Sequence, residues 1–115
     1  MKIENELGYI EISEKAIADI AGYAAMTCYG VVGMAHQRGT DGLIEILSGK
    51  HVSKGVKVRF NDKGEALVDV YVILEQAIKI SVVAENIIDA VKYNVEKQAG
   101  VKVRRISVNV VSIRM

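Results

Sequence analysis

The segment from Ile80 to Val110 constrains the fold more than any other part of this chain, and it reads ISVVAENIIDAVKYNVEKQAGVKVRRISVNV. Its first part places apolar residues at the spacing of an amphipathic helix, which Ser81 can cap and Gly100 can end. Apolar and polar residues then alternate, as in a strand with two different faces. A helix followed directly by a strand predicts mixed α and β structure. The predicted buried stripe of the helix is Val83, Ala84, Ile87, Ile88, Val91 and Val95.

Three segments alternate with the two-residue period of strands, namely residues 56–60, 67–74 and 101–113. The first two are joined by Asn-Asp-Lys-Gly, which has the composition of a tight hairpin turn. In the third segment the alternation shifts phase near Arg104 and Arg105, which predicts a β-bulge there. The predicted core face of the second segment comprises Val68, Val70, Val72 and Leu74.

The N-terminal third predicts a strand followed by a second long helix. Residues 8–12 read as a short strand, and Ser13 is a good N-cap for the helix that follows. The helix is expected to stop near Gly30, because glycine can adopt the left-handed conformation that ends helices. Its apolar stripe comprises Ile17, Ile20, Ala21, Ala24, Ala25 and Cys28.

The segment between this helix and the first alternating strand is less regular. Residues 30–34 form a compact apolar turn or short strand, and residues 36–42 and 50–55 are expected to be loops. Between the two loops, the apolar residues within 43–47 have the spacing of a short helix that ends at Gly49.

These elements predict a single α+β domain over residues 1–115. The expected architecture is a two-layer sandwich, with two long helices and one short helix on a mostly antiparallel sheet, in the order β-α-α-β-β-α-β. A chain of 115 residues is long enough to bury a hydrophobic core without metal or disulfide support.

Charge and hydropathy argue against several classes of protein. The formal net charge of +1 provides no electrostatic footprint for nucleic acid or anionic lipid. No stretch approaches the roughly 20 apolar residues of a membrane span, and the first residues lack the apolar core of a signal peptide. The single cysteine precludes an intramolecular disulfide and fits a reducing compartment. We therefore expect a cytoplasmic protein without direct membrane insertion.

The residues most able to carry chemistry are one cysteine and two histidines. Cys28 lies on an apolar helix stripe, so we interpret it as a small buried side chain rather than a nucleophile. His36 and His51 fall in predicted loops, without the three or four ligands at recognisable spacing that zinc requires. No pair of carboxylates stands out as a general acid and base. The sequence therefore predicts no catalytic site, no metal and no cofactor, and a protein that is not an enzyme.

A Gly-Val-Val-Gly sequence at residues 30–33 supports an alternative function. A G-x-x-G loop after a helix is the element with which KH domains clamp single-stranded RNA. Here the middle pair is valine rather than lysine or arginine, and residues 36–42 separate the loop from the next helix. Nucleic acid is therefore not the expected partner, and a small KH-like single-stranded RNA-binding domain is the alternative. In the structural interpretation, the two valines pack under the sheet.

Two blocks of sequence together resemble the alkaline shock protein family of bacterial envelope-stress proteins. The first block is GYIEISEKAIADIAGYAA, followed by GVVGM at residues 30–34. The second is the helix from Val83 to Gly100 with the strand that follows it. Residues 53–58, SKGVKV, also resemble the family's central strand entry, so the resemblance covers nearly the whole chain.

The resemblance implies a non-enzymatic structural or interaction protein of the cell-envelope stress response or homeostasis. It also implies that the protein forms a homo-oligomer and binds a partner protein. The partner would be a membrane-anchored protein or a fatty-acid-kinase-like protein. A cytoplasmic domain would then become membrane-associated through its partner.

The expected surface for self-association is the face of the sheet that the helices leave open. If the predicted core face turns toward the helices, Tyr71 and Ile73 turn outward. Val111 and Ile113 join them if the register of the last strand allows. Four such side chains would form an apolar patch typical of an interaction site. Alternatively, residues 36–55 fold over this face and bury it within the monomer.

Overall fold

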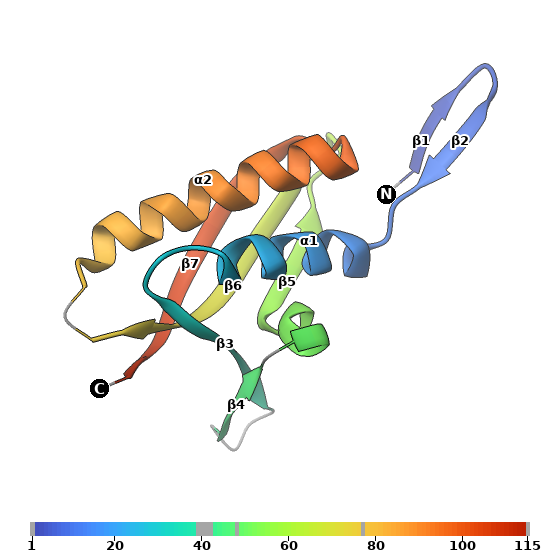
Figure 1. The fold of residues 1–115 in the computed structure, drawn as a ribbon. Helices are drawn as coiled ribbons and strands as arrows, with labels where there is room; N and C mark the ends of the chain where they lie inside the picture. Colours follow the sequence, from blue (N-terminus) through green and yellow to red (C-terminus); the bar gives the residue numbers. More distant parts are fainter. Residues whose placement is uncertain (1, 39–42, 48, 77, 115) are drawn as a thin grey trace.

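The computed structural model describes residues 2–38, 43–47, 49–76 and 78–114. Two helices lie over a twisted sheet, and an N-terminal hairpin projects from this body (Figure 1). The radius of gyration is 14.7 Å and the longest extent is 54 Å, whereas a compact domain of this length has a radius of gyration of about 13 Å. The projecting hairpin makes the molecule elongated.

The hairpin consists of β1 (Lys2–Asn5) and β2 (Gly8–Glu11), which pair antiparallel with Ile3 opposite Ile10. The second of these strands confirms the prediction for residues 8–12, whereas the first was not predicted. Helix α1 (Glu14–Met26) follows directly. The predicted cap is confirmed, because the Ser13 Oγ accepts a hydrogen bond from the Ala16 N–H at 3.0 Å.

The sheet contains five strands arranged around β6. The path β4-β3-β6-β5 is antiparallel, and β7 is added parallel to β6. Because β5 pairs with the first half of β6 and β3 with its end, these two strands share one edge of β6 and β7 occupies the other. The mostly antiparallel sheet is therefore confirmed. The strand bounds are β3 Val31–Arg38, β4 Leu43–Leu47, β5 Val56–Phe60, β6 Ala66–Glu75 and β7 Val103–Arg114.

The short helix predicted over residues 43–47 is wrong, because this segment is strand β4. Its backbone pairs antiparallel with β3 from Met34 to Arg38, so the predicted loop over residues 36–42 is also wrong for 36–38, while 39–42 lie outside the described residues. The five residues of this segment are too few for a stable isolated helix. Backbone pairing with β3 therefore favours the extended conformation. The short helix of the fold is instead the 3-10 helix η1 (Gly49–Gly55), where a loop was expected.

Helix α2 (Ile80–Ala99) connects the parallel strands β6 and β7. Its N-cap is Lys79, without a side-chain hydrogen bond, rather than the predicted Ser81. Its predicted end is confirmed, since Gly100 has a left-handed φ of 68°. The bulge in β7 is also confirmed: Val103 pairs with Ala66 and Arg105 with Leu67, which leaves Arg104 as the extra residue.

The core lies between the helices and one face of the sheet. The predicted core face of β6 is confirmed, because all four residues are fully or almost fully buried. Val83, Ile87, Val91 and Val95 of α2 are buried against them, while Ala84 and Ile88 are half-buried. Helix α1 contributes mostly alanines and one large residue, Ile17, which allows it to approach the sheet closely.

Candidate interaction site

The structure does not bring the cysteine and the histidines into one reactive group. Cys28 follows α1, and its thiol donates to the Ala24 carbonyl at 3.5 Å. Burial raises the pKa of this thiol, so the nucleophilic thiolate is disfavoured at neutral pH. Among the described residues, no group of three or more His, Cys, Asp and Glu side chains is placed to hold a metal ion.

The two histidines have different surroundings. His36 lies on β3, and its Nδ1 is 3.0 Å from the Lys54 carbonyl oxygen. A carbonyl can only accept, so Nδ1 carries the proton and the ring holds β3 to η1. His51 is exposed on η1 and lines a surface groove.

Packing and backbone conformation explain the first glycine of the Gly-Val-Val-Gly sequence. Gly30 is buried with a φ of 88°, and a Cβ there would lie 2.7 Å from the Ile78 Cδ1 and 3.1 Å from the Val83 Cγ2. Val31 packs against the core, and a register shift in β3 leaves Val32 40% exposed. The sequence therefore has a structural role here, and nothing in these contacts favours the RNA-binding alternative.

The four residues predicted to form an interface occupy different environments. Tyr71 is half-buried beneath Lys57, whose Nζ lies 5.5 Å from the ring centre, and Ile73 is only 5% exposed. Val111 is half-buried and Ile113 is 46% exposed. A register shift at this end of β7 pairs Ile73 with Ser112 and places Ile113 beside Leu74 of the core face. An interface at these residues stays a prediction, but Ile73 is too buried to serve as a simple probe of it.

Helix α2 begins near the end of β7 (Figure 1), and several exposed apolar residues belong to these two segments and to the start of β3. This region is held together by backbone pairing: Leu74 is the register partner of both Val31 and Ile113, and the Glu75 N–H donates to the Gly30 carbonyl at 2.8 Å. We call this surface the apolar end; it comprises Tyr29, Val32, Ile80, Val82 and Ile113. Of these, the sequence analysis named only Ile113 as a possible interface residue, although Ile80 and Val82 were visible as apolar positions off the predicted stripe of α2.

The outer edge of β7 is protected against pairing with a second copy. Among the described strands, β7 pairs with β6 alone. Antiparallel pairing of two such edges would bring Arg104 and Arg105 of one copy close to Arg114 of the other. Like charges opposite one another are unfavourable, and charged residues are a common protection of edge strands. These arginines therefore disfavour antiparallel pairing of two copies along this edge.

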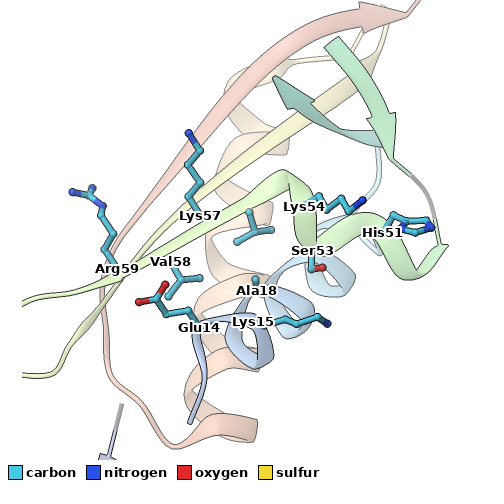
Figure 2. A pocket seen from close by; sticks show the side chains of 10 residues that line it. Glu14, Lys15, Ala18, His51, Ser53, Lys54, Lys57, Val58 and Arg59 are labelled. Atoms are coloured by element: carbon cyan, nitrogen blue, oxygen red, sulfur yellow. The ribbon is translucent and has the colours of Figure 1, made fainter. Parts of the chain in front are cut away.

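A groove of about 690 Å³ lies between α1, η1 and the outer edge of β5. Its floor is apolar, formed by Ala18, Val56 and Val58, each 7% exposed. Figure 2 shows Lys15 and Lys54 extending from α1 and η1, while Lys57 and Arg59 point from β5 away from the floor. Glu14 is the one acidic residue among the lining residues. The groove thus combines an apolar floor, a strand edge and a rim of four cations.

The sequence was compared with known proteins and protein families. Residues 2–115 match the model of the alkaline shock protein 23 family, which is described as having a cell envelope-related function. The Bacillus subtilis (strain 168) protein YloU is 40% identical over 117 residues, covering 100% of this chain and 96% of the relative. The Streptococcus pyogenes serotype M6 protein Spy1614 is 37% identical over 116 residues, covering 100% and 95%. Both relatives are described as uncharacterized, and no solved structure matches the chain significantly.

The family match agrees with the features of the structure. No helix within the described ranges is long and apolar enough to cross a membrane. The described residues provide an apolar end and a cation-rimmed groove. The match extends across both blocks on which the resemblance rested. The chain therefore belongs to the alkaline shock protein 23 family, whose function is related to the cell envelope.

Proposed function

We propose that the protein is a non-enzymatic interaction module of cell-envelope homeostasis, which self-associates and binds a partner protein. The apolar end carries this proposal. Five of the eight large apolar residues with substantial exposure lie there. Scattered exposed apolar residues are normal, whereas their concentration in three segments that meet at one end of the fold supports an interaction surface.

The small size of the apolar end limits the strength of the association. A stable interface buries about 800 Å² on each partner, which is more than five partly exposed side chains provide. We therefore expect a reversible dimer with a dissociation constant in the micromolar range, for which about 8 kcal/mol is sufficient. A weak contact of this kind would assemble only where the protein is concentrated, for example on a partner that gathers it at the envelope.

Sedimentation velocity over a concentration series tests this proposal. The variant Tyr29→Asp with Val82→Asp places two charges in the apolar end. Val82 lies in the first turn of α2, where an acidic residue is favourable, so the fold should be retained. We expect dimerisation to weaken at least about tenfold, since charges are unfavourable in a desolvated interface.

The control is Tyr23→Asp with Tyr93→Asp, which adds the same charge on exposed outer surfaces of α1 and α2. It should dimerise as the wild type does. A wild type that stays monomeric at high concentration, or a control that dimerises as poorly as the test variant, would overturn the proposed surface.

A further inference from the structure

The N-terminal hairpin is an arm whose two strands, among the described strands, pair only with each other. It consists of two four-residue strands that extend from the body (Figure 1). An isolated two-stranded hairpin is at best marginally stable in water and needs a further strand or a packed face. Its sequence, KIENELGYIE, contains four apolar residues that could pack against such a face. The arm is therefore expected to gain stability from another surface.

The base of the arm is fixed in direction. Ile12 packs against the hydrophobic core, and Ser13 caps α1 through its hydrogen bond to the Ala16 N–H. These are the only two residues between β2 and α1. The cap and the packing at these two residues favour the projecting direction of the arm. In this direction the arm can meet a second molecule.

The groove beside β5 has the features that such an arm requires. Among the described strands, β5 pairs with β6 alone, so its outer edge can accept a strand. With five residues, β5 is long enough to pair with either four-residue strand of the arm. The arm residues 2–11 carry three glutamates and one lysine, a net charge of −2. The groove residues comprise four cations and one glutamate, a net charge of +3. Two of these cations, Lys15 and Arg59, also face the carboxylates of Asp19 and Asp69 at 3.1 and 3.9 Å, whereas no such pairing is seen for Lys54 and Lys57 among the described residues.

We propose that the arm of one copy docks in the groove of a second copy and extends its sheet along β5. This inference rests on the proposed self-association and specifies a second contact for it. The contact joins two different surfaces of the same chain, so it is heterologous and produces rings or open chains rather than closed dimers. Together with the apolar end, it allows assemblies larger than a dimer.

Reciprocal charge reversal tests this contact. One variant, Glu4→Lys with Glu6→Lys, makes the arm basic. The other, Lys15→Glu with Lys54→Glu, makes the rim acidic on both sides of the groove. Alone, each variant has an arm and a groove of the same sign, and we expect its assembly beyond the dimer to weaken about tenfold. Mixed, the basic arm fits the acidic groove and the unchanged acidic arm fits the unchanged basic groove, so assembly should return.

The mixture distinguishes contacts between molecules from contacts within one. If the arm acted within its own chain, mixing would restore nothing, and that result would overturn the proposal. Unchanged assembly of each variant alone would also overturn it. The control variant Lys79→Glu with Lys92→Glu reverses the same number of charges as each test variant, at exposed positions on and beside α2. It should assemble as the wild type does.

Repeating the experiment with Tyr29→Asp and Val82→Asp added to both variants separates the two proposals. Association that returns on mixing in this background comes from the arm alone. If the two charge-reversal variants associate on mixing in this background, and Tyr29→Asp with Val82→Asp does not weaken the dimer of the otherwise wild-type protein, the proposed apolar surface is wrong and the arm contact is supported. If the apolar-end substitutions weaken the dimer but the charge reversals change nothing, the arm contact is wrong and the apolar surface is supported.

Discussion

Replacing Gly30 by alanine should destabilise the fold through two effects that a second glycine can separate. The residue has a φ of 88°, and the left-handed region costs an L-residue about 1 to 2 kcal/mol. The new Cβ would also lie 2.7 Å from the Ile78 Cδ1 and 3.1 Å from the Val83 Cγ2. Overpacking of a core costs about 1 to 3 kcal/mol. The Ile78 methyl can rotate away, whereas Val83 is β-branched and buried, so we expect a total of about 3 kcal/mol.

Gly100 provides the matched control. It also has a positive φ, of 68°, but a Cβ there would meet no atom within 4 Å. Gly100→Ala should therefore show the backbone strain alone, about 1 to 2 kcal/mol. The difference between the two variants measures the clash at Gly30. Adding Ile78→Ala to Gly30→Ala should recover part of that difference, because it removes the nearest atom.

Urea unfolding followed by circular dichroism at 222 nm gives the free energies of unfolding. With an unfolding entropy of about 2.1 cal/mol/K per residue, a loss of 3 kcal/mol lowers the melting temperature by about 12 °C. The reasoning is refuted if Gly30→Ala is no less stable than Gly100→Ala. It is also refuted if Gly30→Ala keeps its stability and loses a salt-resistant complex with single-stranded RNA.

Three further predictions concern individual side chains. The Cys28 thiol, whose pKa is raised by burial, should react slowly with maleimide at neutral pH, and the rate should rise with pH and on unfolding in urea. The pKa of the Glu65 carboxyl is held below its ordinary value by the hydrogen bond from Asn61 at 2.9 Å and by Lys102. Its stabilising contribution is therefore present above the unfolded pKa and lost as pH falls through the folded one, and NMR titration should show Asn61→Ala raising that pKa. The Glu96 carboxylate accepts from the Val103 N–H at 2.9 Å, so Glu96→Ala should lower the free energy of unfolding by about 1 to 2 kcal/mol in denaturant titrations.

The sequence was most informative where periodicity was long and its ends were marked. The apolar stripe of α2 runs for several turns and ends at a glycine that the structure finds in the left-handed conformation. The phase shift at Arg104 required a bulge, and the register contains one. Local patterns of this kind determine structure because one face must be buried over many residues.

Short segments were predicted poorly because distant pairing decides their conformation. Residues 43–47 have apolar positions that fit a helix as well as a strand, and pairing with β3 selects the strand. Strand β1 has little apolar pattern and exists only through its partner β2. Ile73 alternates away from the core face of β6, yet it is buried. The apolar end combines residues from three separate segments, and no local pattern could have placed them together.

The position of β6 has a consequence for the way the protein opens. Both edges of this strand are occupied, by β3 and β5 on one side and by β7 along its whole length on the other. Loss of a single neighbour exposes only the backbone amides that point to that edge. The amide hydrogens of β6 should therefore be among the slowest to exchange with solvent, whereas those of the N-terminal hairpin exchange through local opening. Hydrogen exchange would then distinguish a slowly exchanging central strand from a rapidly exchanging N-terminal arm. This difference is expected if the body is stably folded by itself and the arm is stabilised by binding to another molecule.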